Sequence, residues 1–454
     1  MNIADILSRV PDYKTFLTVE EMDRHTLALA QKYPGIVTVF KAGESQSGRP
    51  LYCLKIGSGA KNALIFGCPH PNEPIGAMML EAFSQLLAED EKLREELPYT
   101  FYLIKAVDPD GLMRNEGWLK GPFTYYNYAR HFYRPAGAKQ VEWTFPLDYK
   151  TLHFHAPLPE TQALMKIIEE TKPAFLFSLH NSAFGGVFWY INREIPSLIS
   201  GLQDIPARHG IPLSLGEPEM PCCQVYQNAV FQFPGLPMMY DYYAQMTGQD
   251  PAAFLNMGSS SIDFANLDGR ECFGLVCEMP YFRNNDSADL TPADITRREA
   301  VLQSCETIEA IYQKLAPLVE TLQAHLSPED PYRLALEERM AMSGASLGAQ
   351  KNFALQNPEF EKPATRAQAF DNLVMLPFMH LLGAGMAASA AEQALKTASP
   401  EGAKALENVV TQAEAMLKAG CGDIEMRIPC DPIDIKSLVS VQLESGLAAA
   451  LAVR

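Results

Sequence analysis

The stretch GCPHPNEPIG holds a histidine and a carboxylate, His70 and Glu73, in the loop after an apolar run at 63–66. Prolines on both sides restrict the backbone, so we expect the two side chains to be held in place. A histidine and a carboxylate at this spacing can share a metal ion, or they can be two polar residues of a turn. Short motifs often occur by chance, so the rest of the chain must decide between these alternatives.

A second histidine and a second glutamate occupy equivalent positions further along the chain. His180 directly follows the apolar run 174–179, and Glu278 directly follows the run 274–277. In open α/β sheets, ligands bind at the carboxyl ends of the strands. If the apolar runs are buried strands of one sheet, these side chains meet at the same edge.

The residue types at this edge match the chemistry of a catalytic zinc ion. Two imidazoles and one carboxylate, from His70, Glu73 and His180, form a ligand set that leaves the fourth position of a tetrahedral zinc ion to water. Hydrolysis then needs a further carboxylate as general base on that water, and Glu278 is the candidate. The sequence therefore predicts metal-assisted hydrolysis with one Zn²⁺ per chain.

The elements that must position these residues alternate between strands and helices over the first 295 residues. Further strand-like runs lie at 37–41, 51–56 and 100–107, and stretches of helical period lie at 19–33 and 75–88. Thr18 is the expected N-cap of the first of these helices. This alternation predicts an α/β fold with a mixed, largely parallel sheet flanked by helices.

The remainder of the chain, 296–454, has a different composition. Strand-like runs disappear and Ala, Leu, Glu, Gln and Met dominate, which predicts an all-helical C-terminal extension after a catalytic domain at 1–295. The segment 372–391 carries no charge, but its proline, histidine, glycines and alanines favour a buried helix over a membrane span. The extension could cover the active site or form a homo-oligomer, and its residues do not choose between them.

The charge balance excludes some classes of partner. Lys and Arg total 37 against 54 for Asp and Glu, and the net charge is −17. Nucleic acids and anionic membranes reward basic surfaces, so we expect neither as a partner. The first residues do not read as a signal peptide, and the nine cysteines form no paired framework, so we expect a cytoplasmic enzyme.

From about residue 16 to residue 282 the sequence resembles the zinc carboxypeptidases of the carboxypeptidase A type. His70 and Glu73 fall on the H-x-x-E zinc pair of that family, His180 on its third ligand, and Glu278 on its catalytic glutamate. The opening segment, with its G-x-S-x-x-G-R hairpin, and the turn DPDG at 108–111 also resemble the family. The resemblance implies a carboxypeptidase/phosphorylase-like fold.

The resemblance also implies roles in substrate binding. NYARHF resembles the family's D-x-N-R-N-W and puts Arg130 on the arginine that binds the terminal carboxylate of the substrate. SSSIDF puts Ile262 at the base of the specificity pocket, which predicts a preference for apolar or aromatic terminal residues. The arginine that polarises the scissile carbonyl has no clean match; Arg114 is the first candidate and Arg134 the second.

Two further family positions depart from the pattern. Asn127 stands where the family has the aspartate that orients the first zinc histidine, so Asp108 is considered for that task. The substrate-capping tyrosine should fall near Leu255, and none of the three nearby tyrosines can be assigned to it. These are Tyr240, Tyr242 and Tyr243.

Three functions remain open from the sequence. The first is a metallocarboxypeptidase that cleaves the C-terminal peptide bond of peptides. The second is a zinc amidohydrolase or deacylase on N-acyl amino acids or γ-linked peptides, since deacylases of related fold share H-x-x-E and a later histidine. The third, a silent binding module, is disfavoured because every expected ligand and the base are present. A peptide or an acyl-amino acid is the expected partner.

Overall fold

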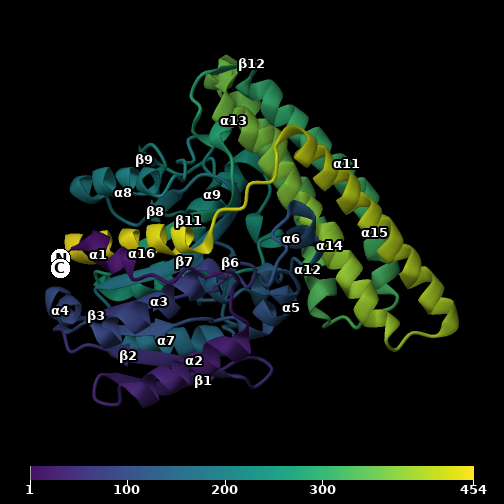
Figure 1. Cartoon of the computed structure of the whole chain (residues 1–454). Coiled ribbons are helices and arrows are strands. Elements are labelled where there is room, and N and C mark those ends of the chain that lie inside the picture. The colour runs from purple at the N-terminus through teal and green to yellow at the C-terminus, as the bar shows by residue number, and fades with distance from the viewer. Residues whose placement is uncertain (1, 454) are drawn as a thin grey trace.

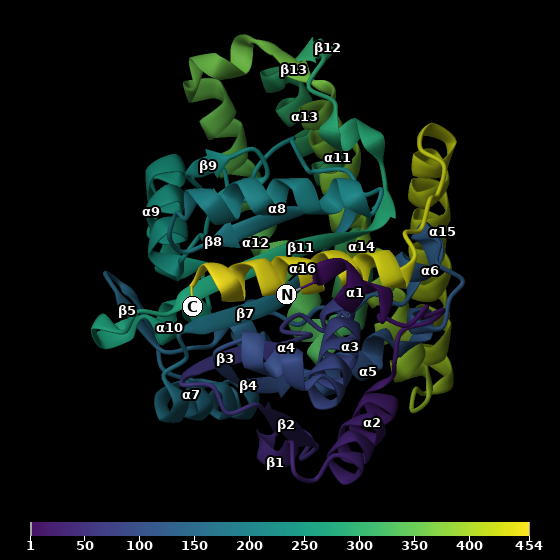
Figure 2. The same ribbon diagram turned by 60° about the vertical axis from the view of Figure 1, so that its left-hand side comes forward.

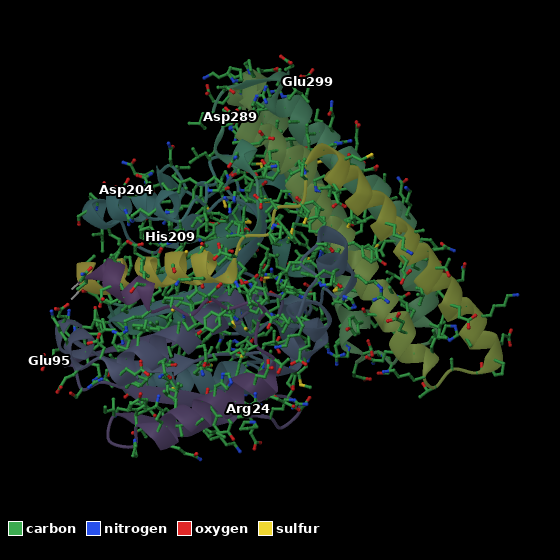
Figure 3. All side chains as sticks on the ribbon, in the orientation of Figure 1. Arg24, Glu95, Asp204, His209, Asp289 and Glu299 are labelled. Atoms are coloured by element: carbon green, nitrogen blue, oxygen red, sulfur yellow. The ribbon has the colours of Figure 1, made fainter. Side chains whose placement is uncertain are left out.

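The computed structural model describes residues 2–453. A nine-stranded sheet with helices packed against it forms one part of the molecule, and a group of long helices stands beside the sheet (Figure 1). Charged side chains such as Arg24, Glu95 and Asp204 project outward from the ribbon (Figure 3). The described cysteines are all unpaired.

The sheet is mixed and its central strands are parallel. The strand order is β1-β2-β4-β3-β7-β11-β8-β10-β9. β4, β3, β7 and β11 run parallel to one another, whereas β1, β2 and β8 pair in antiparallel fashion. The predicted mixed, largely parallel sheet is confirmed. The strands are β1 (Val37–Glu44), β2 (Pro50–Ile56), β3 (Lys61–Phe66), β4 (Tyr99–Ile104), β7 (Phe175–Gly185), β8 (Phe188–Ile191), β9 (Val225–Gln227), β10 (Val230–Gln232) and β11 (Phe273–Arg283).

The two central strands β7 and β11 are longer than the sequence predicted. Every residue of β7 is buried, as are all residues of β11 except the last. The apolar runs end before His180 and Glu278, but the strands continue through them, and the two residues are partners in the parallel register. A buried polar residue inside a strand interrupts the apolar pattern without ending the strand, which is why the expected ends fell too early.

Helices cover the sheet and connect its strands. α2 (Val19–Lys32) begins at the predicted cap, because the Thr18 hydroxyl accepts from the Glu21 amide in a capping box. α3 (Ile75–Glu89) follows the loop that carries His70 and Glu73. The other helices of this part are α1 (Ile3–Ser8), α4 (Glu91–Glu96), α5 (Pro109–Leu119), α6 (Tyr125–Arg130), α7 (Pro159–Thr171), α8 (Pro196–Arg208), α9 (Leu236–Thr247) and α10 (Ser261–Ala265).

The long helices beside the sheet come from the C-terminal part of the chain. α14 packs against α11 and α15, and α11 packs against α12 (Figure 1). A π-helical segment, η7 (Asp371–Met375), leads into α14, and the short strands β12 (Pro292–Thr296) and β13 (Pro363–Thr365) pair at one end of the group. The helices are α11 (Arg297–Gln323), α12 (Pro331–Gln356), α13 (Arg366–Phe370), α14 (Leu376–Leu395) and α15 (Pro400–Arg427).

The last helix, α16 (Ile435–Ala452), leaves this group and returns to the sheet. It packs against α3, α8 and β11 (Figure 2). One hydrophobic core includes residues of the sheet, of α16 and of the long helices. The C-terminal extension predicted at 296–454 therefore shares a core with the sheet through the long helices and also through α16. It includes the short strand β13 as well as helices.

Two helical segments are long and apolar enough to cross a membrane by length and composition alone. They are Arg366–Leu395 and Ile435–Ala452. In the most apolar 18-residue window of each segment, 61% of the first and 72% of the second is buried inside the protein. Packing against α11, α15 and the sheet accounts for this apolar character, in agreement with the buried helix expected at 372–391.

Candidate active site

Three side chains converge where β3 ends beside the longer strand β7. His70, Glu73 and His180 each offer one donor atom, and these atoms lie within 4.8 Å of one another. The Nδ1 atoms of the two histidines are 3.1 Å apart, and each lies 3.1 Å from a carboxylate oxygen of Glu73. Ligands of a tetrahedral zinc ion with bonds of about 2.1 Å are roughly 3.4 Å apart, so the spacing suits such an ion.

Backbone and side-chain contacts fix the loop that carries His70 and Glu73 against β7. The side-chain oxygen of Asn181 accepts from the backbone N–H of Ile75 at 3.1 Å, and the backbone N–H of Asn181 donates to the Glu73 carboxylate at 3.3 Å. Tyr281 on β11 donates both to the backbone oxygen of Asn72 and to Asn181. The loop after β3 is thus tied to the two strands that carry His180 and Glu278.

The chemistry of the three donors fits one Zn²⁺. Burial and the nearby Arg134 lower the pKa of His70 to about 3, so its imidazole is neutral, as a metal ligand must be. Lone pairs that converge at 3.1 Å repel one another unless a cation or a proton lies between them. All three side chains are buried, and a metal ion between them would satisfy the three donors together. We conclude that these residues can hold a single metal ion.

Arg134 contacts the cluster directly. Its Nη2 lies 2.8 Å from His70 Nε2, and its Nη1 lies 3.4 Å from Glu73 Oε1. It was the second candidate for the arginine that acts on the scissile carbonyl. Of the two arginines considered for that role, Arg134 is the one at the cluster.

Glu278 lies beside the cluster on the adjacent strand. Its Oε1 is 3.9 Å from His180 Nδ1, farther than the distances within the ligand set. Burial raises the pKa of Glu278 well above its ordinary value, and the carboxylates of Glu219 and Glu73 add to this effect. The expected arrangement of a carboxylate next to the metal ligands, but outside them, is present.

Arg114 is not at this site, contrary to the sequence prediction. Its guanidinium packs over the rings of Tyr133 and Tyr332, at 5.4 and 5.2 Å, and donates to Gln393 at 3.4 Å. The turn after β4 begins α5, and the third residue beyond PDG points from this helix toward α12 and α14 instead of toward the sheet edge. The prediction for Arg114 is therefore corrected.

Arg130 is also displaced from the site. Its guanidinium forms ion pairs with Glu392 of α14 and Glu414 of α15, and it donates to Ser389 at 3.2 Å. The C-terminal helices dock on α6 and supply these carboxylates, a long-range contact that the local motif could not reveal. Arg130 does not line the cavity next to the metal ligands.

Neither Ile262 nor Asp108 lines the cavity beside the metal ligands. The Ile262 side chain packs on Gly274 of β11, where an added Cβ would lie 2.6 Å from it, and it does not line the cavity. Asp108 caps α5 by accepting from the Gly111 amide at 2.8 Å, and no hydrogen bond joins it to His70 in the described part of the chain. The three tyrosines of α9 belong to a second core that packs against α12.

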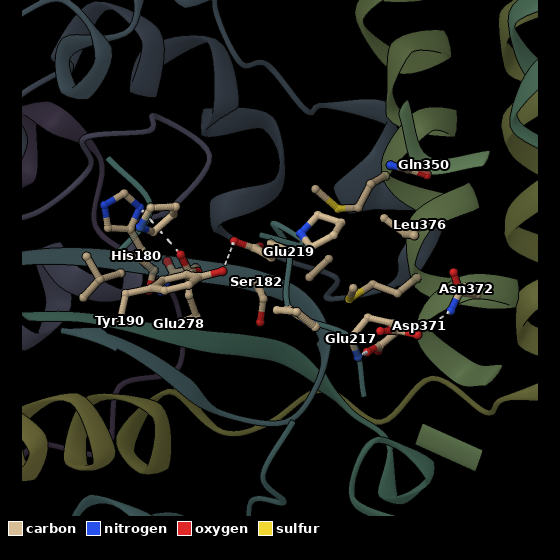
Figure 4. Close-up of a pocket in the computed structure, with 18 of the residues that line it drawn as sticks. His180, Ser182, Tyr190, Glu217, Glu219, Glu278, Gln350, Asp371, Asn372 and Leu376 are labelled. Atoms are coloured by element: carbon tan, nitrogen blue, oxygen red, sulfur yellow. Dashed lines mark hydrogen bonds and ion pairs between the residues drawn. The ribbon is translucent and has the colours of Figure 1, made fainter. Parts of the chain in front are cut away.

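A cavity of about 340 Å³ opens beside the cluster. One wall comes from the sheet and carries His180, Tyr190 and Glu278; the opposite wall comes from the C-terminal helices (Figure 4). No sequence pattern indicates a chemical role for these helices, because contacts between distant parts of a chain leave no local pattern. The residues of the second wall are Arg297, Val301, Gln350, Phe353, Phe360, Asp371, Asn372, Met375, Leu376 and Met379.

The far end of the cavity is rich in carboxylates. Arg297 holds Glu217 through two nitrogen atoms, and Asp371 accepts from the Glu217 amide at 2.7 Å. Burial raises the pKa of Asp371 to about 8, and the neighbouring carboxylate of Glu217 contributes. Glu219, nearer the metal ligands, accepts from the Tyr190 hydroxyl at 3.3 Å (Figure 4).

Comparison with known proteins agrees with this geometry. The family model described as zinc carboxypeptidase matches residues 22–194. Over this range the chain is similar to the zinc carboxypeptidase family. The match includes His70, Glu73 and His180, and it supports a zinc metallopeptidase; Glu278 and the C-terminal helices lie beyond it.

Several solved structures are similar to the chain. Carboxypeptidase A from Helicoverpa armigera has 17% identity and a TM-score of 0.40, with 62% of this chain and 70% of that chain covered. A metallo-carboxypeptidase from Burkholderia cenocepacia has 16% identity and a TM-score of 0.35, with 75% and 70% covered. Murein-tripeptide amidase MpaA from Escherichia coli O157 has 17% identity and a TM-score of 0.27, with 55% and 87% covered.

Proposed function

We propose that the protein is a zinc-dependent metallocarboxypeptidase that hydrolyses the C-terminal amide bond of short peptides. The observation that carries this proposal is the meeting of His70, Glu73 and His180 with Glu278 in one cavity. A cavity of about 340 Å³ suits a small substrate or the end of a short peptide. The family match over 22–194 supports the class of reaction.

The residues divide the chemistry between them. A zinc ion held by His70, Glu73 and His180 would supply a Lewis acid that lowers the pKa of a water molecule to about 7. The Glu278 carboxylate takes a proton from the attacking water and hands it to the leaving nitrogen. Its side chain is 9% exposed, so this transfer takes place largely shielded from bulk water.

Arg134 is the proposed partner for oxygen atoms of the substrate. Of the two arginines that line the cavity, Arg297 is held by Glu217, whereas Arg134 is 26% exposed and faces the metal ligands. A guanidinium binds a carboxylate through two parallel hydrogen bonds and can equally donate to a polarised carbonyl. In this proposal, Arg134 binds the substrate carboxylate, which the sequence predicts for Arg130, or the scissile carbonyl, for which Arg114 is the first candidate from the sequence.

A zinc amidohydrolase on N-acyl amino acids or γ-linked peptides is the second candidate function. The observation that favours it is the position of Arg130, the expected carboxylate-binding residue, in ion pairs outside the cavity. A wall of C-terminal helices around a small cavity also suits a compact substrate. The chemistry at the metal is the same for both functions, so only the substrate distinguishes them.

Matched substrates separate the two functions. The zinc-loaded protein is incubated with short peptides that carry a free or an amidated C-terminus, and with N-acyl amino acids, and the products are identified by mass. The proposed function predicts loss of single C-terminal residues from free peptides, with amidated peptides cleaved at least roughly tenfold more slowly because Arg134 lacks its carboxylate partner. Cleavage of N-acyl amino acids alone would establish the second function, and cleavage of none would contradict both.

A cytoplasmic location is part of the proposal. The unpaired state of the described cysteines and the net charge of −17 support it. A homo-oligomer formed through the C-terminal helices stays a prediction. Those helices line the cavity, which supports the other role expected for them, the covering of the active site.

A further inference from the structure

A buried chain of hydrogen bonds ends on His180. Ser178 precedes it by two residues on β7, and the Ser178 hydroxyl oxygen lies 2.8 Å from His180 Nε2. The same hydroxyl donates to Glu142 Oε2 at 3.2 Å. All three residues are at most 5% exposed, and Glu142 and His180 also line the cavity beside the metal ligands. The hydrogen bonds of this series are therefore made between side chains of the protein.

Glu142 is fixed at the far end of this chain. Its Oε1 accepts from the amide of Ser261 at 3.0 Å and from the hydroxyl of Ser261 at 2.7 Å. Its Oε2 accepts from the Ser178 hydroxyl, so both carboxylate oxygens face donors, an arrangement that favours the ionised form. An ionised carboxylate only accepts hydrogen bonds, so Ser178 is the donor between these two side chains.

Counting protons assigns the state of His180. A serine hydroxyl has one proton, and Ser178 uses it in the hydrogen bond to Glu142. Only a lone pair of the Ser178 oxygen therefore faces His180 Nε2. Nε2 must therefore carry the ring proton. A neutral imidazole has a single N–H, which leaves the lone pair on Nδ1. Nδ1 is the atom that lies 3.1 Å from both His70 Nδ1 and Glu73.

We propose that Glu142 and Ser178 are positioning residues that hold His180 in the tautomer that binds zinc through Nδ1. This role concerns metal affinity and is independent of the substrate. Hydrogen-bond partners of metal-binding histidines typically contribute about 10–100-fold in metal affinity. No motif in the sequence points to Glu142, because it reaches the site from a short 3-10 helix, Val141–Trp143, more than thirty residues before His180.

The first test reads the tautomer directly. The ¹⁵N shifts and couplings of the His180 ring are recorded in the zinc-free protein, with His180→Gln as the assignment control. We expect the proton on Nε2 in the wild-type protein. In Glu142→Gln, the amide oxygen keeps the Ser261 donors and the amide nitrogen donates to Ser178, which turns the Ser178 proton toward His180. The ring proton should then move to Nδ1, an effect that a purely structural role would not produce.

The second test measures zinc affinity by competition with a chromophoric chelator. Ser178→Ala and Glu142→Gln should each bind zinc roughly 10–100-fold more weakly than the wild type. Glu160→Gln and Ser304→Ala are the matched controls, since both residues are buried and neither contacts the metal ligands. Both controls should keep wild-type zinc affinity.

Two outcomes would overturn the proposal. One is a ring proton on His180 Nδ1 in the zinc-free wild-type protein. The other is wild-type zinc affinity in Ser178→Ala together with Glu142→Gln. If Glu142→Gln does not fold, the wild-type spectrum and Ser178→Ala still decide the question.

Discussion

Arg134 and His70 form a contact that a bound metal would change. Arg134 Nη2 lies 2.8 Å from His70 Nε2, whereas His70 Nδ1 faces His180 and Glu73. A guanidinium only donates, so this contact requires a lone pair on Nε2 and puts the ring proton on Nδ1. Binding a metal through Nδ1 requires the opposite arrangement. Arg134 and the metal therefore favour opposite tautomers of His70.

Replacing Arg134 should separate metal binding from turnover. In Arg134→Ala we expect zinc affinity to equal that of the wild type or to rise by up to roughly tenfold, because a competing charge-assisted hydrogen bond of about 1.5 kcal/mol is lost. Hydrolysis should nevertheless fall by about 10²–10³-fold, as when one donor to a developing oxyanion is removed. Chelator competition and steady-state kinetics measure the two quantities.

Arg134→Lys is the companion variant, since it keeps the charge and loses the paired donors. We expect it to recover only part of the activity. A large loss of zinc from Arg134→Ala would show that the arginine supports the ligand set instead of competing with the metal, and unchanged hydrolysis would remove it from the reaction.

Arg130 should matter for stability and not for catalysis. It is 7% exposed, and its partners Glu392 and Glu414 lie on the C-terminal helices. Arg130→Ala should lower the free energy of unfolding by on the order of 1–2 kcal/mol, a modest loss because both glutamates are partly exposed to solvent. kcat/KM should stay within a few-fold of wild type. A selective loss of activity on substrates with a free carboxylate would return Arg130 to the role that its sequence motif suggested.

The parts of the site that the sequence could predict are those set by local pattern. Apolar runs located the central strands, and the first polar residue after each run gave His70, His180 and Glu278. The positions of the two arginines could not be predicted, because each side chain contacts a distant partner. Arg130 forms ion pairs with residues of α14 and α15, and Arg114 packs over the ring of Tyr332. The same reason hid the second wall of the cavity.

Glu142 shows a different limit. It has no local signal at all, because its importance comes from Ser261 and Ser178, which are brought to it by the folding of α10 and β7. Asp108 shows the converse case. Its turn sequence was recognised, yet the carboxylate serves the start of α5 and not the neighbouring histidine.

Asp371 should make stability depend on pH. Its pKa in the folded protein is about 8, against an ordinary value of 3.8, because it is buried near Glu217 and Glu219 with Arg297 engaged by Glu217. The folded state therefore binds the proton more tightly than the unfolded state. The stabilisation is fully present below about pH 4 and is lost as pH rises through about 8, at up to about 1.4 kcal/mol per pH unit.

Asp371→Asn keeps an acceptor for the Glu217 amide and removes the titration. Urea unfolding at several pH values should show wild-type stability falling between about pH 4 and 8 relative to the variant. Asp108→Asn is a useful comparison, since burial also raises the pKa of Asp108, to about 7. Parallel stability curves for Asp371→Asn and wild type would mean that Asp371 is ionised at neutral pH.

Glu278 distinguishes catalysis from metal binding. It is the register partner of His180, and its carboxylate lies 3.9 Å from His180 Nδ1, outside the ligand set. Glu278→Gln keeps the size of the side chain and removes the base, so zinc content should stay at one per chain while turnover falls by roughly 10²–10⁴-fold. His180→Ala is the contrasting variant, which should lose zinc and activity together. Metal analysis and single-turnover kinetics make the comparison. Turnover of Glu278→Gln within a few-fold of wild type would exclude Glu278 as the base, and loss of its zinc would make it a ligand instead.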